Sequence, residues 1–189
     1  MYTSAQEYLI ALGSNLPSDI GSPARTVQHA LDRLNRSGCR VAAVSRLYRT
    51  PCFPAGAGPD YVNAAARLMV EGTPADCLAR LHAVEAELGR LRVQRWGQRT
   101  LDLDLLAAGG LVLPDRESFE AWRRLPLAEQ VRTTPECLIL PHPRLQDRAF
   151  VLVPLAEIAA DWMHPVLGQS VTEMLAALPG ADVRQVVAL

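Results

Sequence analysis

The sequence predicts a single two-layer α/β sandwich domain, and three observations carry this prediction. Predicted strands alternate with predicted helices along the chain, and one pair of strands is adjacent in sequence. The 189 residues are 49% apolar, which is enough to bury a hydrophobic core. No internal repeat or low-complexity linker divides the chain. We therefore expect one domain over residues 1–189.

The first half of the chain has clear start and stop signals for its elements. An apolar run ends at Gly13, as expected of a strand that exits into a turn. Ser22 can cap the next helix, because Pro23 occupies its first position. Apolar residues then recur at helical spacing, at Leu78, Leu81, Val84 and Leu88. The predicted order is a strand at 7–12, a helix at 22–38, strands at 40–50 and 61–72, and a helix at 75–92.

The rest of the chain is less regular. A proline- and glycine-rich loop is expected at 51–60. Residues 114–134 are polar and arginine-rich, with one helical turn expected through Phe119 and Trp122. Within 100–113 we expect a strand, a glycine turn and a second strand. Within 138–162 we expect a strand, a proline turn and an apolar helix. A last helix is expected at 170–180.

Composition excludes several classes of function. The formal net charge is −1, so nothing indicates binding to nucleic acid or to an acidic membrane. All 19 basic residues are arginine, which excludes a Walker phosphate loop and a Schiff-base mechanism, since both need lysine. The four cysteines and four histidines lack the spacing of a zinc site. Without a signal peptide or an apolar membrane span, a cytoplasmic location is expected.

Two aspartates, Asp102 and Asp104, interrupt the apolar stretch "TLDLDLL". In a strand they share one face, about 7 Å apart, while the leucines around them face the core. Parallel carboxylates repel each other unless a cation lies between them, and Mg²⁺ prefers a few carboxylates together with phosphate oxygens and water. A half-buried strand with one solvated face gives the same pattern, so the pair alone leaves both interpretations open.

Four arginines directly upstream shift the balance toward phosphate. They are Arg90, Arg92, Arg95 and Arg99. Guanidinium groups beside two carboxylates can hold the oxygens of a polyphosphate that a metal bridges. For any single arginine, an exposed surface ion pair is the alternative. Trp96 lies among them and either stacks on a flat heterocycle or packs in the core.

Five segments together resemble the 6-hydroxymethyl-7,8-dihydropterin pyrophosphokinase family of folate biosynthesis. They are "ALGSNL", "SRLYRTPCF", "DYVNAA", "RWGQRTLDLDLL" and "LPHPRLQDRAFVLVPLAEIA". The resemblance implies an α+β, ferredoxin-like two-layer sandwich with a mostly antiparallel sheet and helices packed on it. It also implies Mg²⁺-dependent transfer of the terminal diphosphate of ATP to the pterin hydroxymethyl group, with AMP as the second product.

The same resemblance assigns the phosphate half of the site. It implies that Asp102 and Asp104 are ligands of two Mg²⁺ ions. With Arg90 and Arg99, which close over the phosphates, they form the catalytic set. The residues implied to contact ATP as co-substrate are Glu85, Arg90, Arg92, Arg95, Arg99, His142 and Arg148.

The pterin half is implied to consist of Gly13, Thr50, Pro51, Phe53, Tyr61, Asn63, Trp96 and Phe150. Trp96 and Phe150 are expected to stack on the two faces of the ring. Asn63 also fits on its own chemistry, because a carboxamide both donates and accepts hydrogen bonds. Without the resemblance, Tyr61 and Phe150 fit an ordinary strand aromatic and a core aromatic equally well.

Residues 114–134 interrupt the resemblance and are expected to form a surface insertion. The alternative is that Arg123 or Arg124 supplies a phosphate contact. The expected partners are ATP and the pterin, with no nucleic acid and no membrane, and the chain is expected to be a monomer. Two rival classes are a metal-dependent glycosyltransferase, for which a Rossmann-like half is missing, and a small-ligand-binding regulatory module. The module needs neither the aspartates nor the arginines.

Overall fold

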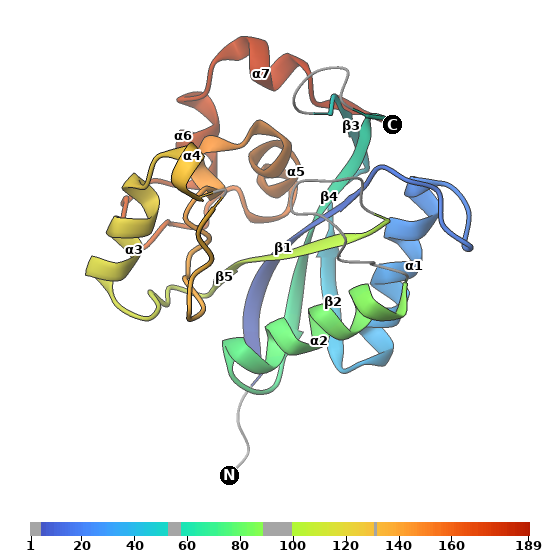
Figure 1. The fold of residues 1–189 in the computed structure, drawn as a ribbon, viewed down its shortest axis with the longest axis horizontal. Coiled ribbons are helices and arrows are strands. Elements are labelled where there is room, and N and C mark those ends of the chain that lie inside the picture. The colour runs from blue at the N-terminus through green and yellow to red at the C-terminus, as the bar shows by residue number, and fades with distance from the viewer. Residues whose placement is uncertain (1–4, 53–57, 89–99, 131) are drawn as a thin grey trace.

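A six-stranded antiparallel sheet forms the centre of the computed structural model, which describes residues 5–52, 58–88, 100–130 and 132–189 (Figure 1). The strand order is β5-β1-β4-β3-β6, and β2 also pairs with β4. All the described strand pairs are antiparallel. The strands are β1 (Gln6–Ser14), β2 (Cys39–Val44), β3 (Tyr48–Thr50), β4 (Tyr61–Val70), β5 (Asp102–Ala108) and β6 (Val187–Ala188).

Helices cover both faces of this sheet (Figure 1). They are α1 (Pro23–Arg36), α2 (Pro74–Glu87), α3 (Arg116–Arg124), α4 (Leu127–Gln130), α5 (Ala149–Ala159), α6 (Val171–Ala176) and α7 (Gly180–Arg184), with a 3₁₀ helix, η1, at Leu145–Asp147. Helices α1 and α2 pack on one face, and α5 and α6 pack on the other. The predicted α+β class with a mostly antiparallel sheet is confirmed, and α5 and α6 add a layer to the two that were expected.

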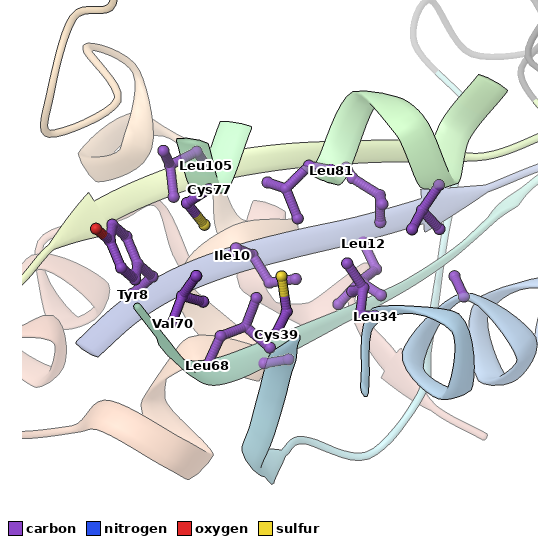
Figure 2. Close-up of a cluster of buried hydrophobic side chains, with 14 of the residues drawn as sticks. Tyr8, Ile10, Leu12, Leu34, Cys39, Leu68, Val70, Cys77, Leu81 and Leu105 are labelled. Atoms are coloured by element: carbon purple, nitrogen blue, oxygen red, sulfur yellow. The ribbon is translucent and has the colours of Figure 1, made fainter. Parts of the chain in front are cut away.

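The alternation of side chains along the strands divides the core in two. Figure 2 shows the larger cluster, in which Ile10, Leu68 and Leu105 meet Leu34 of α1 and Leu81 of α2. The smaller cluster joins the opposite face of the same strands to the apolar side chains of α5 and α6, and includes Leu9, Ala65, Leu106, Leu152, Leu155, Val171 and Met174. Strands β1, β4 and β5 therefore present residues to two different environments.

The helix boundaries follow the predicted signals where those signals are local. The side chain of Ser22 accepts a hydrogen bond from the backbone of Arg25, and Pro23 begins α1. Thr73 and Asp76 form a reciprocal capping box at the start of α2. These side chains satisfy backbone N–H groups that the first turn of a helix leaves without partners.

Three predicted elements differ from the structure. The second strand expected near Leu113 and the strand expected near Leu140 are reduced to one isolated bridge between those two residues. Each is followed by a proline, Pro114 or Pro141, which has no N–H to extend the pairing. The strand expected at 40–50 is split into β2 and β3, because the side chain of Ser45 accepts the N–H of Ala65 in place of the ladder.

The stretch at 114–134 is more ordered than the single helical turn expected there. Helix α3 runs over nine residues, and Asp115 caps it by accepting the N–H of Ser118. Phe119 on this helix is fully buried, and its ring lies 5.5 Å from that of His164. Arg123 and Arg124 both pair with Glu120 on the same helix. The structure therefore gives no support to a phosphate contact by either arginine.

Candidate functional site

One lateral row of the sheet brings residues from four strands together. In register, Asp102 of β5 faces Gly13 of β1, Gly13 faces Asn63 of β4, and Asn63 faces Tyr48 of β3. Adjacent strands lie about 4.8 Å apart, so Asp102 and Asn63 are about 10 Å apart across Gly13. Both side chains lie on the face of the sheet on which α5 packs.

Asp102 and Asp104 share one face of β5, as the sequence predicted. Both are half-buried, whereas Leu101, Leu103 and Leu105 are buried in the cluster on the opposite face. The carboxylates therefore remain partly open to solvent on a strand whose other face is firmly packed.

Arg148 and His142 come to this face from the segment that precedes α5. The backbone N–H of His142 donates to the carbonyl of Leu106, which ties the segment to β5. Burial lowers the pKa of Arg148, and the nearby carboxylate of Asp104 opposes that effect. A guanidinium group thus lies within electrostatic reach of the aspartates, in the arrangement that phosphate binding needs.

The ring of His142 is neutral in this structure and accepts a hydrogen bond through Nδ1. Burial, and then the positive charges of Arg148 and Arg144, lower the pKa of His142 to about 3. Its Nδ1 accepts the backbone N–H of Arg144 at 3.1 Å. The proton of the neutral ring is therefore on Nε2, which leaves one N–H to donate to an anion.

Glu85 lies on α2, on the other side of β5 from the predicted phosphate site. It is 1% exposed, and its Oε1 accepts the backbone N–H of Leu103 at 2.7 Å. This bond fixes the backbone of β5 at Leu103, which lies between the two aspartates in the sequence. A direct contact of Glu85 with ATP stays a prediction; the contact that the structure shows is with the strand that carries the aspartates.

The predicted pterin residues at the centre of the sheet are held by contacts with one another. Nδ2 of Asn63 donates to Oγ1 of Thr50 at 2.6 Å, and both residues are buried. This bond turns the amide oxygen of Asn63 toward Gly13, where an added Cβ would lie 3.1 Å from it. The absence of a side chain at Gly13 thus leaves the amide oxygen room for a ligand.

The other predicted residues are more open or lie outside the described parts. Tyr61 is half-buried and pairs in register with Thr50, while Pro51 is exposed. Phe150, at the start of α5, is 39% exposed, with the guanidinium of Arg148 5.7 Å from its ring centre. The predicted residues outside the described ranges are Phe53, Arg90, Arg92, Arg95, Trp96 and Arg99.

The sequence reasoning missed two buried polar residues that follow Gly13. Oγ of Ser14 donates to the carbonyl of Thr100 at 2.5 Å, and Nδ2 of Asn15 donates to the carbonyl of Pro59 at 3.3 Å. Ser14 thereby fixes the chain just before Asp102. Two polar residues directly after an apolar strand were the available signal, but that pattern also fits an ordinary exposed turn.

A second missed group joins α5 to β3. Oε1 of Glu157 accepts from the hydroxyl of Tyr48 and from Nε of Arg46, each at 2.6 Å. These bonds hold the helix that begins next to Arg148 against the strand that carries Thr50. The two predicted halves of the site are therefore connected through protein contacts.

The donor set fits magnesium better than a metal held by the protein alone. Within the described ranges, no group of three or more histidine, cysteine, aspartate or glutamate side chains could enclose an ion. Two neighbouring carboxylates that are partly open instead suit a hard cation that takes its other ligands from phosphate and water.

A carboxylate pair near an arginine on the antiparallel sheet of an α+β protein suits an enzyme that transfers a phosphoryl group. The family model for 7,8-dihydro-6-hydroxymethylpterin-pyrophosphokinase matches residues 9–160. The chain belongs to this family and is a pyrophosphokinase, an enzyme of the diphosphotransferase class.

Curated relatives agree with this assignment, and a solved structure shares the fold. The chain is 39% identical over 175 residues to the 2-amino-4-hydroxy-6-hydroxymethyldihydropteridine pyrophosphokinase of Pseudomonas aeruginosa, covering 92% of this chain and 93% of the relative. The protein of the same name from Synechocystis is 38% identical over 168 residues, covering 88% and 73%. The Plasmodium falciparum HPPK-DHPS wild-type structure shares the fold, with a TM-score of 0.64 at 12% identity.

The chain covers less than half of that solved protein. The match spans 91% of this chain but 44% of the Plasmodium chain. Within the described ranges, none of the helices has the length and apolar character that crossing a membrane requires.

Proposed function

We propose that this enzyme transfers the terminal diphosphate of ATP to 6-hydroxymethyl-7,8-dihydropterin in folate biosynthesis, giving AMP and the pterin diphosphate. The lateral row that joins Asp102 to Asn63 across Gly13 carries this proposal. It puts a carboxylate suited to a metal–phosphate complex and an amide suited to a heterocycle on one face of the sheet. The names of the relatives point to the same substrate. The chain is expected to act as a single-domain monomer in the cytoplasm.

Asp102 and Asp104 would hold two Mg²⁺ ions against the phosphates. When bound, such ions neutralise phosphate oxygens and make the phosphorus more electrophilic. The two half-buried carboxylates supply hard oxygen ligands, and Ser14 and Glu85 fix the backbone on either side of Asp102. The chain itself therefore orients both carboxylates before any ligand arrives.

Arg148 and His142 bind phosphate oxygens on the side of α5. Arg148 supplies a permanent charge, and the neutral His142 supplies the N–H of Nε2. Arg90 and Arg99 bind the diphosphate group that is transferred. Arg92, Arg95 and Glu85 complete the expected nucleotide contacts. Positive groups placed before the reaction lower the barrier as charge develops in the transition state.

The pterin binds at the centre of the sheet. The amide oxygen of Asn63 accepts an N–H of the ring, while Thr50 holds the amide in that orientation. Phe150 and Trp96 stack on the ring faces, and Gly13, Pro51, Phe53 and Tyr61 line the rest of the pocket. The hydroxymethyl group then points along the row toward Asp102.

The chemical step is a displacement at the β-phosphorus. The hydroxymethyl oxygen forms a bond to the β-phosphorus, and the bond from that phosphorus to the oxygen it shares with the α-phosphate breaks. AMP leaves with that oxygen, and the hydroxyl proton passes to water. A loose transition state does not require a strong general base.

The test is AMP formation from ATP and 6-hydroxymethyl-7,8-dihydropterin, with and without Mg²⁺. Wild type is expected to form AMP only with Mg²⁺, and Asp102→Asn is expected to lose at least about a hundredfold in kcat. Asp32→Asn, an exposed aspartate on α1 at the opposite face, is the matched control and keeps full activity. A folded, magnesium-loaded wild type that binds nucleotide but forms no AMP would overturn the proposal in favour of a binding module.

A further inference from the structure

The segment before α5 carries a second arginine, Arg144, which the proposed reaction does not use. Its backbone N–H donates to Nδ1 of His142, so the two residues are held in a fixed relation. Its side chain is only 26% exposed, and Nε lies 3.2 Å from Oδ2 of Asp147. Arg144 is thus fixed next to His142 and lies between His142 and Arg148 in the sequence, the two residues that we assign to phosphate.

The charge of Arg144 is felt by both of its neighbours in the site. It contributes to lowering the pKa of His142 and that of Arg148, so its positive charge acts on both groups. Two guanidinium groups close together repel each other unless anions lie near them. Asp147 is a weak counter-charge for Arg144, because it is 42% exposed and its Oδ2 also accepts from Gln146.

We propose that Arg144 is a further phosphate-binding residue, which contacts the triphosphate of the nucleotide beside Arg148 and His142. This inference rests on the proposed function and names one more residue of the same site. A guanidinium offers paired N–H groups that match phosphate oxygens, and a polyanion in this place relieves the repulsion between the two arginines. Binding of ATP then exchanges the exposed pair with Asp147 for a phosphate contact.

A purely structural role makes a different prediction. The pair between Arg144 and Asp147 brackets the 3₁₀ helix η1, so Arg144 could serve only to hold that turn. If so, substituting either Arg144 or Asp147 has the same effect on ATP affinity. If Arg144 binds phosphate, substituting Asp147 frees the guanidinium, so ATP affinity falls in the Arg144 variant and does not fall in the Asp147 variant.

The experiment compares Arg144→Gln, Arg144→Lys and Asp147→Asn in the AMP assay. Arg144→Gln is expected to raise the KM for ATP about tenfold, as loss of one charge-assisted contact does, with the KM for the pterin unchanged. Arg144→Lys keeps part of the affinity, and Asp147→Asn leaves the KM for ATP equal or lower. The control is Arg40→Gln, an exposed arginine on β2 that faces Met69 in register, near the other end of β4 from Asn63.

Binding of a nonhydrolysable ATP analogue with Mg²⁺, measured by calorimetry, separates this inference from the proposed function. An active wild type with unchanged nucleotide affinity in Arg144→Gln overturns the role of Arg144 and leaves the reaction standing. Equal weakening in Arg144→Gln and Asp147→Asn also overturns it, in favour of the structural role. If wild type forms no AMP, the reaction is wrong, and analogue affinity alone still decides whether Arg144 contacts phosphate.

Discussion

The two faces of β5 have different tasks, although their residues alternate one by one. Leu103 and Leu105 are buried in the cluster with α1 and α2. Asp102 and Asp104 are half-buried on the face toward α5, near Arg148. One strand therefore packs into the core with one face and presents the proposed metal ligands on the other. The pleat that orients the carboxylates is fixed by packing of the leucines, so the two properties should be separable by substitution.

The largest effect on stability is expected on the leucine face. Leu103→Ala should lower the free energy of unfolding by about 2–5 kcal/mol, because it removes a buried side chain and leaves a cavity. AMP formation per folded molecule should stay within severalfold of wild type, since the backbone bond from Leu103 to Glu85 does not need the side chain. Urea unfolding and the AMP assay, both at low temperature, measure the two quantities.

Asp102→Asn is the matched variant on the other face. Its free energy of unfolding should equal that of wild type within about 1 kcal/mol, because the site is partly solvated, while its activity collapses. Loss of activity in a fully folded Leu103→Ala protein would show that the two faces are not independent.

The two ends of β5 also differ. The end away from the aspartates lies beside a buried histidine, and the second prediction concerns the pH dependence of stability there. There, Nε1 of Trp162 donates to the carbonyl of Gly109. His164 is fully buried against Phe119 and Trp162, and its Nδ1 accepts from the backbone of Val166 and Leu167. Burial lowers the pKa of His164 to about 4, an effect that Arg123 adds to and Glu120 opposes.

Between pH 6.5 and pH 4, the unfolded chain therefore binds a proton at His164 and the folded chain does not. The stability linked to this group is complete above the ordinary histidine pKa of about 6.5 and is lost as the pH falls toward 4, with about 2 kcal/mol lost by pH 5. His164→Asn retains an acceptor but does not titrate there, so its unfolding free energy should depend less on pH over that range. Urea unfolding of both proteins from pH 7 to pH 5 measures the difference, and parallel curves would exclude His164 as the source.

These regions also differ in how far the sequence could predict them. The alternation around Asp102 and Asp104, the cap at Ser22 and the helix start at Pro23 are local signals, and the structure confirms each of them. The contact of Phe119 with His164 joins residues 45 positions apart, on segments whose local patterns give no sign of each other. A polar, arginine-rich stretch was therefore expected to be irregular, although one buried aromatic holds a helix there.

The candidate site shows the same division. The resemblance named Asp102, Gly13 and Asn63, but the row that joins them depends on the register between strands that lie far apart in sequence. The bond from Ser14 to Thr100 spans 86 positions and could not be inferred from either segment alone. The resemblance therefore named candidate residues for the chemistry, and long-range pairing decides how they are held.

The smallest effect is expected in the middle of the row, and it separates the two substrates. Gly13→Ala places a Cβ 3.1 Å from the amide oxygen of Asn63, so the amide must shift, and this shift strains the bond from its nitrogen to Thr50. The KM for the pterin should rise about tenfold, the value of one displaced hydrogen bond to a buried group, while the KM for ATP stays constant. Steady-state kinetics with each substrate varied in turn measure both constants.

Equal rises in the two constants would mean that the added methyl group disturbs β5 and Asp102 as well. An unchanged pterin KM would mean that the amide of Asn63 does not face the ring. In the expected outcome, a single methyl group at the centre of the sheet weakens pterin binding and leaves the phosphate half intact, because the added Cβ meets Asn63 and Tyr61 of the pterin half.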